Sequence, residues 1–321
     1  MSRHWRHVDP RVVVAVTAAV LLAGVVAVLA LQVPEPPPVA ERTPPAEQVG
    51  PEQGAAAQPR RLVALGDFWA AGPGLPAGAQ PSAEEEQCGR SPAAYPRLVA
   101  AELGLALVDR TCVGAGPEEV GRGGRTDAGL TVPPQIDALS PRTDVVTVSV
   151  GAQDDDLLDR TVTACQQLAP TAPQGDPCRR AFGDAGLAEV RRDATAAGQR
   201  VGMLLREVAR RAPDARVLVV GYANPFPAGS SCPDRSGVAD GDLTYLRQAA
   251  ASIIDATRSA ARAAGVEYVD TQPSFAGHQL CSRAAYVARG PAGGPVLRLT
   301  ARGHRAVAES VLDALAGGSG Q

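Results

Sequence analysis

Short apolar runs alternate along this chain with longer, alanine-rich segments in which apolar residues recur every three or four positions. Runs of the first kind are typical of strands buried on both faces, and segments of the second kind of helices. The predicted strands lie near residues 62–66, 105–109, 144–150, 215–221 and 266–270. The predicted helices cover residues 93–103, a long segment that ends before Pro213, 242–264 and 301–315. This alternation favours a three-layer α/β/α domain with a five-stranded parallel sheet.

Glycines and irregular segments mark the limits of these elements. Gly104 and Gly265 fit the ends of two helices, because glycine readily adopts the left-handed conformation that closes a helix. Two long segments, 72–89 and 153–183, are expected to be irregular inserts, and loops of that length are usually functional or tied by disulfides. Residues 317–321 predict a frayed tail.

The longest apolar stretch, residues 12–33, lies close to the N-terminus. About 20 such residues are enough for a helix to cross a bilayer. Three arginines precede the stretch and none follows it directly, so the positive-inside rule places residues 1–11 in the cytoplasm and the rest of the chain outside. A cleaved signal peptide is the alternative, because residues 28–30 (Val-Leu-Ala) fit a signal peptidase site. We favour the membrane anchor, since the apolar run is longer than a usual signal core.

Residues 34–60 are rich in Pro, Ala, Glu and Gln and lack apolar periodicity, which is typical of a solvated linker. The linker would hold a domain of residues 61–316 away from the membrane. All six cysteines belong to this domain, and an even number in an oxidising compartment indicates disulfides. Sequence alone allows several connectivities, of which we prefer pairing between neighbours: Cys88 with Cys112, Cys165 with Cys178, and Cys232 with Cys281.

Charge and composition exclude two classes of partner. The net charge is −3 with both signs interspersed, and aromatic residues make up 3% of the chain, so nucleic-acid binding is not expected. A metal site is not expected either, because no cysteine pair has C-x-x-C spacing and few histidines follow the linker. The acidic run 154–156 could suggest a cation, but it is more typical of a solvated loop or a helix start.

Four glycine-containing motifs follow predicted strands or precede the last helix, and the carboxyl edge of a parallel sheet is where ligands bind. They are LVALGDFWAAGPG (62–74), TCVGAG (111–116), VTVSVGAQD (146–154) and LRLTARGHRAVAE (297–309). In this order, and with GHQLC at 277–281, they resemble the conserved blocks of secreted actinobacterial SGNH (GDSL-type) esterases and lipases over about residues 60–316. The resemblance implies the flavodoxin-like SGNH-hydrolase fold and no metal or organic cofactor.

The resemblance also assigns catalytic positions, and their occupants cannot perform the family's chemistry. That chemistry needs a nucleophilic serine, a histidine base, a carboxylate and donors for an oxyanion. The serine position holds Phe68, which has no atom that can attack, and the histidine position holds Arg298, which stays protonated. Pro295 replaces the carboxylate and Gln153 the asparagine donor, so that only Gly114 matches. The sequence therefore predicts an inactive enzyme.

A catalytic set displaced to other residues is not expected. The chain has no G-x-S-x-G elbow. Ser149 lies within a predicted strand and residues 230–231 (Ser-Ser) lie beside a cysteine, so structural or solvated roles are expected for these serines. His304 belongs to the last helix and is expected to face solvent or cap a contact, while His278 matches a histidine that the family does not use in catalysis.

The resemblance implies a cleft beside Phe68, which is either filled by side chains or converted into a binding surface. We favour a vestigial pocket that Phe68 fills over an apolar binding surface with Arg298 at its rim. Arg298 is expected to pair with Asp67 or Asp154 rather than with an anionic ligand. The candidate ligand-binding set is Asp67, Phe68, Trp69, Gly114, Gln153, Asp154 and Arg298.

The sequence thus predicts a membrane-anchored, extracytoplasmic and catalytically inactive domain that binds a lipid, glycan or protein of the cell envelope. Two alternatives stay open. One is a residual or repurposed ester hydrolase that acts on lipids or acylated glycans, and the other is a purely structural envelope protein.

Overall fold

The computed structural model describes residues 60–125, 129, 131–229, 237–290 and 296–317. Its central sheet has five parallel strands in the order β2-β1-β5-β6-β7, which confirms the five predicted strands. The order reverses between β1 and β5, as in flavodoxin-like folds, so the expected fold class is confirmed. The strands are β1 (Arg61–Gly66), β2 (Ala106–Asp109), β5 (Val145–Ser149), β6 (Arg216–Val220) and β7 (Glu267–Val269).

Side chains of the central strands alternate between two hydrophobic clusters, one on each face of the sheet. In β1, Leu62 belongs to one cluster, whereas Val63 and Leu65 belong to the other. Because both faces are buried, the strand reads in the sequence as an unbroken apolar run.

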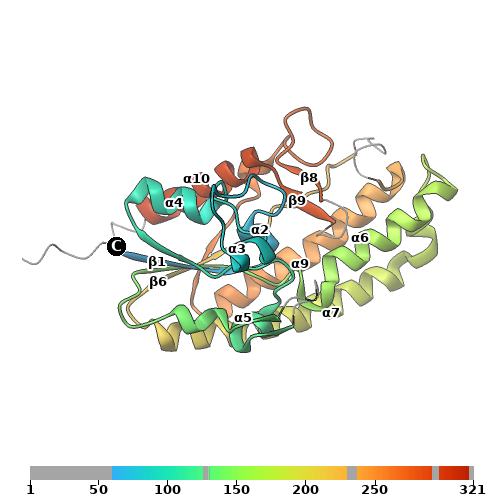
Figure 1. Cartoon of the computed structure of the whole chain (residues 1–321). Helices are drawn as coiled ribbons and strands as arrows, with labels where there is room; N and C mark the ends of the chain where they lie inside the picture. The colour runs from blue at the N-terminus through green and yellow to red at the C-terminus, as the bar shows by residue number, and fades with distance from the viewer. Residues whose placement is uncertain (1–59, 126–128, 130, 230–236, 291–295, 318–321) are drawn as a thin grey trace, which may run out of the picture. The chain divides into compact units, whose positions relative to one another are not determined.

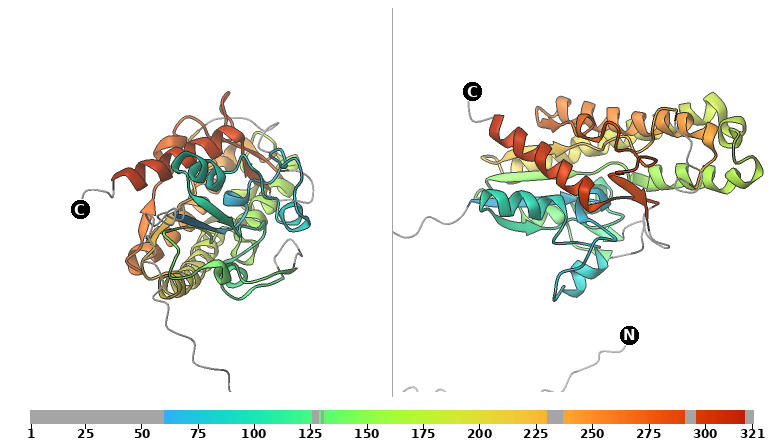
Figure 2. Two further views of the ribbon diagram at one scale, coloured as in Figure 1. Left: turned by 60° about the vertical axis from the view of Figure 1, so that its left-hand side comes forward. Right: turned by 90° about the horizontal axis from the view of Figure 1, so that it is seen from above.

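Helices cover both faces of the sheet (Figures 1 and 2). Helices α4 (Tyr95–Leu103) and α10 (Ala301–Gly317) pack together on one face. Helices α5 (Pro117–Arg122) and α7 (Pro177–Arg211) pack together on the other, and α9 (Leu243–Ala263) runs along α7. All four predicted helices are present. Gly104 and Gly265 have the positive φ angles, 61° and 67°, expected at helix ends.

The prediction of two irregular inserts is wrong for residues 153–183. This segment contains α6 (Leu157–Leu168) and the first turns of α7, which extend beyond the sheet in Figure 1. Gly183, with φ 52°, interrupts the helical path inside α7 and so breaks its sequence periodicity. The other insert, 72–89, contains only the short helix α3 (Ala83–Gln87).

The remaining elements are short. The helix α2 (Phe68–Ala71) follows β1 directly. Two small antiparallel pairs join β3 (Gly124–Arg125) to β4 (Thr131–Val132) and β8 (Val287–Arg289) to β9 (Leu297–Leu299). The 3₁₀ turns are η1 (Gln135–Ala138), η2 (Asp154–Asp156), η3 (Ala169–Thr171), η4 (Asp240–Asp242) and η5 (Pro273–Phe275).

Two of the three predicted disulfides are confirmed, Cys88–Cys112 and Cys165–Cys178. Cys281 is also disulfide-bonded, and its predicted partner, Cys232, lies outside the described residues. The predicted span 12–33, the linker up to residue 59 and the tail after residue 317 lie outside them too. Within the part of the chain that the structure describes, no helix is long and apolar enough to cross a membrane.

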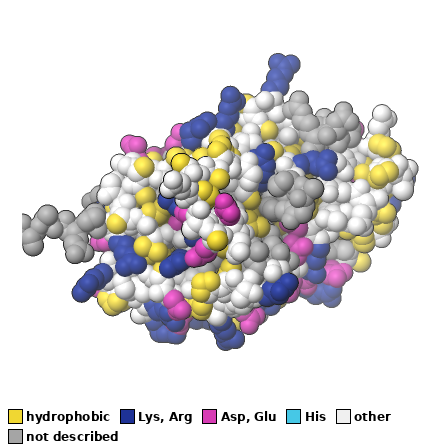
Figure 3. All heavy atoms as spheres, viewed as in Figure 1, with side chains coloured by type: hydrophobic (Ala, Val, Ile, Leu, Met, Phe, Trp, Pro, Cys, Tyr) yellow, Lys and Arg dark blue, Asp and Glu magenta, His cyan; other side chains and the backbone are white. Residues whose placement is uncertain are grey.

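Figure 3 shows arginine and acidic side chains interspersed over the visible face, without a large area of one sign.

Candidate functional site

The first motif forms a tight turn from β1 into α2 at the carboxyl edge of the sheet. Gly66 makes the turn possible: its φ is 146°, and a Cβ atom there would lie 2.3 Å from the carbonyl oxygen of Ser149. Asp67 follows and caps α2, since its Oδ1 accepts the backbone N–H of Trp69 at 2.9 Å. Phe68 is therefore the first residue of a helix that begins at the sheet edge.

Asp67 is completely buried and is held from two sides. Besides the Trp69 N–H, it accepts the Tyr222 hydroxyl, with 2.6 Å between Tyr222 Oη and Asp67 Oδ2. Tyr222 follows β6, and its hydroxyl also accepts the backbone N–H of Ala152 at 3.1 Å. Burial raises the pKa of Asp67 to about 7, although these hydrogen bonds act in the opposite direction. The carboxyl is committed to internal contacts.

The ring of Phe68 fills the place beside the turn. Phe68 has an exposed fraction of 0%. Its ring stacks on Tyr222 at 6.5 Å between centroids and meets the edge of Trp69 at 6.0 Å. The cavity left beside these rings has a volume of only about 20 Å³ and is lined mostly by apolar side chains. A cavity of that size holds about one water molecule. This geometry favours a filled pocket over an apolar binding surface.

The backbone N–H of Gly114, one of the two potential oxyanion donors, is hydrogen-bonded to the side-chain amide oxygen of Gln153. Gln153 is buried, and its Oε1 accepts the backbone N–H of Gly114 with 2.7 Å between the two atoms. A glutamine has one methylene more than the family's asparagine, and this length carries its amide oxygen to the glycine. The N–H of Gly114 is thus already satisfied within the protein.

The expectation that Arg298 pairs with Asp67 or Asp154 is wrong. Asp154 is buried and receives Arg200 of α7 instead, with Nε at 3.0 and 2.9 Å from its two carboxylate oxygens and a further contact from Nη2. Arg298 belongs to the β8–β9 hairpin, and its stem passes over Gly74. Arg298 Nη1 lies 3.4 Å from the carbonyl oxygen of Leu299. Pro295 lies outside the described residues.

Neither alternative base is placed for catalysis. Of the two roles expected for His304, exposure to solvent is wrong and a capping contact is confirmed. The ring is completely buried, and its Nδ1 accepts the backbone N–H of Tyr95, the first residue of α4, at 3.2 Å. Burial, helped by the positive charge of Arg298, lowers the pKa of His304 to about 3. The ring of His278 stacks on Tyr286 at 4.0 Å.

Ser149 has the structural position expected of it. It is buried, and its Oγ lies 2.9 Å from the Tyr95 hydroxyl and 3.2 Å from the carbonyl oxygen of Val220. Ser230 and Ser231 lie outside the described residues.

Sequence reasoning missed three residues of this region. Tyr222 follows a predicted strand, and that position at the sheet edge was the available signal. Arg200 and Asp159 carry no local signal, because their contacts are distant in sequence. Asp159 is buried and accepts the backbone N–H of Val296 at 3.1 Å. Burial raises the pKa of Asp159 to about 7, and its charge adds to the rise at Asp67.

A sequence model of the GDSL-like lipase/acylhydrolase family matches residues 64–306. The chain belongs to this family. The chain is 35% identical over 223 residues to Lipase 2 of Streptomyces coelicolor, a match that covers 68% of this chain and 72% of that protein. It is 30% identical over 226 residues to a lipase of Streptomyces rimosus, covering 70% and 75%.

Solved structures agree with the family assignment. Phospholipase A1 from Streptomyces albidoflavus superposes with a TM-score of 0.62 and 25% identity, covering 80% of this chain and 99% of that one. An extracellular lipase from S. rimosus gives a TM-score of 0.62 with 27% identity, covering 79% and 99%.

The family resemblance places the nucleophile at Phe68, whose side chain is a hydrocarbon, and the base at Arg298, whose side chain is a guanidinium. An aromatic ring cannot form an acyl intermediate, and an arginine cannot accept the proton of a serine. What the site does offer is a packed aromatic cluster around a buried, hydrogen-bonded carboxyl.

Proposed function

We propose that this chain is a non-catalytic member of the GDSL-like family. Residues 12–33 tether it to the membrane, and its domain acts outside the cytoplasm through contacts with a lipid, glycan or protein of the cell envelope. The Cys88–Cys112 and Cys165–Cys178 disulfides fit an oxidising compartment, and one solved relative is an extracellular lipase, which supports export.

One observation carries the proposal that catalysis is lost: Gly114 donates its N–H to Gln153. A hydrolase must keep donors directed at the place where the oxyanion forms, and the loss of one such donor costs about 10²–10³ in rate. Here the N–H of Gly114 is bonded to the amide oxygen of Gln153 and is not directed at a substrate. The loss of a serine or histidine from a triad costs roughly a millionfold by itself.

The filled pocket argues further that the domain works through its surface. The cavity of about 20 Å³ beside Phe68 is far too small for an acyl chain. A partner would therefore contact other parts of the domain.

Ester hydrolysis is the second candidate, favoured by the names of the relatives, which are lipases. It would need a nucleophile other than Phe68. The assay that separates the two uses the full-length chain in a maltoside detergent, with p-nitrophenyl acyl esters as substrates and Lipase 2 of S. coelicolor as the active control. We expect hydrolysis at the buffer background and no serine labelled by a fluorophosphonate probe. Hydrolysis above background together with a labelled serine would overturn the proposal.

A matched pair of variants tests the role of the Gly114–Gln153 bond. The first restores the family residues at three positions: Phe68→Ser, Pro295→Asp and Arg298→His. The second adds Gln153→Asn, which shortens the amide and frees the N–H of Gly114. We expect no measurable esterase activity in the triple variant and a rate above background only in the quadruple variant. Robust activity in the triple variant contradicts this account of the donor.

The tether is tested separately, by fractionating cells that express the chain with a C-terminal epitope. We expect the protein in the membrane fraction with its N-terminal residues intact by mass spectrometry. A soluble form whose N-terminus follows Ala30 would replace the anchor by a cleaved signal peptide.

A further inference from the structure

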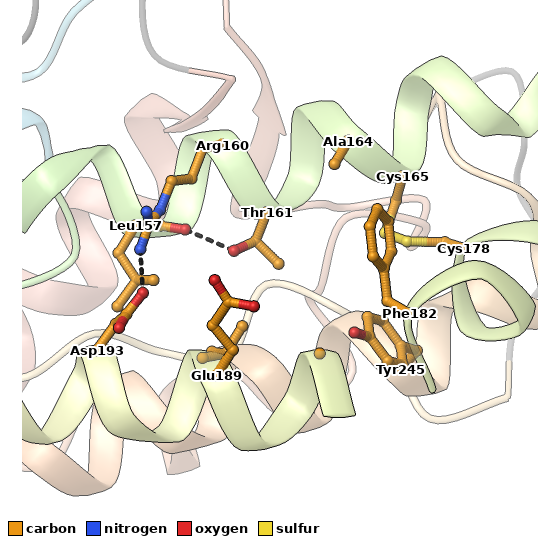
Figure 4. Close-up of a pocket in the computed structure, with 12 residues that line it drawn as sticks. Leu157, Arg160, Thr161, Ala164, Cys165, Cys178, Phe182, Glu189, Asp193 and Tyr245 are labelled. Atoms are coloured by element: carbon orange, nitrogen blue, oxygen red, sulfur yellow. Dashed lines mark hydrogen bonds and ion pairs between the residues drawn. A yellow bond between two sulfur atoms is a disulfide. The ribbon is translucent and has the colours of Figure 1, made fainter. Parts of the chain in front are cut away.

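A second pocket lies where α6 and α7 extend beyond the sheet, and part of α9 closes it (Figure 4). Its volume is about 230 Å³. Its walls are fixed by two contacts. The Cys165–Cys178 disulfide joins α6 to the start of α7, and Asp242, at the start of α9, accepts the backbone N–H groups of Cys178 and Arg179 at 2.9 Å each. This helical pocket is therefore preformed.

Two aromatic rings lie at one end of the helical pocket. Phe182 is exposed over 42% of its surface, unusual for so large an apolar side chain, whereas Tyr245 is almost fully buried. Both lie against Gly186. A Cβ atom at Gly186 would lie 2.6 Å from Phe182 Cβ and 2.5 Å from the Tyr245 hydroxyl, so the absence of a side chain there gives both rings their places.

Negative charge faces the same space. Figure 4 shows the carboxylate of Glu189 directed from α7 into the pocket, between the aromatic end and Arg160. Arg160 forms an ion pair with Asp193, which neutralises both groups. Glu189 has no ion pair among the residues that the structure describes. The negative charge of Glu189 acts on the aromatic end of the pocket. Burial, together with the charges of Asp242 and Glu189, raises the pKa of Tyr245.

The helical pocket favours an organic cation, because it combines the carboxylate of Glu189 with the aromatic rings of Phe182 and Tyr245. An ammonium group is attracted to the face of an aromatic ring and to a carboxylate at the same time. An anion would be repelled by Glu189. The described part of the chain offers no cluster of three or more His, Cys, Asp and Glu side chains that could hold a metal ion. A neutral apolar group would contact the rings but would gain no attraction from the carboxylate of Glu189, which is exposed to water.

We propose that the helical pocket binds a small organic ammonium group, primary or methylated, against Phe182 and Tyr245 with its charge toward Glu189. This site is independent of the cleft around Phe68 and of whether the chain hydrolyses esters.

The test is a titration of the full-length chain, in maltoside detergent, with choline and with ethanolammonium, followed by ligand-observed NMR. The control ligand is 3,3-dimethylbutan-1-ol, which has the shape of choline without its charge. We expect saturable binding of at least one cation below about 100 mM, and binding of the neutral isostere that is about tenfold weaker or more. Stronger binding of choline assigns a methylated group, and stronger binding of ethanolammonium a primary one.

Two surface variants locate the site. Glu189→Gln should weaken cation binding by about tenfold while leaving the neutral isostere unaffected, and Phe182→Ala should weaken binding of the cation by a similar factor. The matched controls are Glu102→Gln, an exposed carboxylate on α4, and Met203→Ala, an apolar side chain of α7 that is 55% exposed. Neither control should change the affinity.

Three results would each overturn the proposal. The first is the absence of saturable binding of either cation. The second is equal affinity for choline and its neutral isostere, which would indicate a merely apolar pocket. The third is an equal effect of Glu189→Gln and Glu102→Gln, which would indicate attraction to the overall charge. Circular dichroism of each variant shows that it is folded, so a loss of binding can be assigned to the pocket.

Discussion

Phe68→Ala should lower the free energy of unfolding by about 4 kcal/mol if the ring is a true part of the core. The side chain is completely buried and packs against Tyr222 and Trp69. Its removal leaves a space of about 100 Å³, which at about 24 cal/mol per Å³ costs roughly 2.4 kcal/mol. The lost transfer free energy of the ring adds about 2 kcal/mol. The neighbouring cavity of about 20 Å³ would join the new space.

The assay is guanidinium unfolding of the full-length chain, followed by near-ultraviolet circular dichroism. A shift of the midpoint at constant slope measures the change in stability. Met203→Ala is the control and should change stability by no more than about 0.5 kcal/mol, because its side chain is 55% exposed. A dry cavity of this size also binds benzene, so benzene should stabilise the variant against heat and leave the parent chain unchanged. A loss below about 1 kcal/mol, with no effect of benzene, would refute the filled pocket and indicate an open cleft.

Three further predictions concern the same domain. Asp67 has a pKa of about 7 in the folded protein against 3.8 for the free side chain. Between these two pH values the folded protein keeps a proton on Asp67 that the unfolded chain has released. The free energy of unfolding therefore falls as the pH rises toward 7. Asp67 should thus contribute about 2 kcal/mol more to the free energy of unfolding at about pH 5.5 than at about pH 8. Equilibrium unfolding of the parent chain and of Asp67→Asn at the two pH values isolates this contribution, because Asp159 and His304 titrate in both proteins. Gln153→Met should cost about 1–3 kcal/mol in denaturant, because it leaves the buried N–H of Gly114 without an acceptor; an unchanged midpoint would contradict the hydrogen bond. Replacing Cys165 and Cys178 by serine should cost roughly 3 kcal/mol and weaken cation binding to the helical pocket, and a double variant with full affinity would separate the disulfide from the pocket.

The sheet and the main helices could be predicted because their signals are local. The central strands are short, mostly apolar runs, and Gly104 and Gly265 mark two helix ends. Residues 153–183 could not be assigned in the same way. A positive φ at Gly183 divides the helical path, and the apolar face of α6 lies against α7 and α9, neighbours that no local pattern identifies.

The residues of the candidate site could likewise be predicted where a local motif marks them, and not where they depend on contacts distant in sequence. Motif order identified Phe68, Gly114 and Gln153 as the positions that decide the chemistry. The partner of Asp154 could not be found, because Arg200 is 46 residues away and a sequence shows several arginines that could serve equally well. The burial of His304 was missed for a similar reason: its helix was recognised, but the face on which α4 packs is a tertiary feature.

Phe68 and Gln153, two residues at positions where the family resemblance places catalytic groups, each make a contact that stabilises this fold. Phe68 fills space that a serine would leave empty, and Gln153 satisfies an N–H that an active enzyme keeps free for its substrate. Active sites generally hold polar groups and cavities at the expense of stability. Phe68 and Gln153 instead make ordinary core interactions. A serine at position 68 would leave a space in the packed aromatic cluster and so lower the stability of the fold. We therefore expect Phe68→Ser, Pro295→Asp and Arg298→His together to give a less stable protein and no active enzyme.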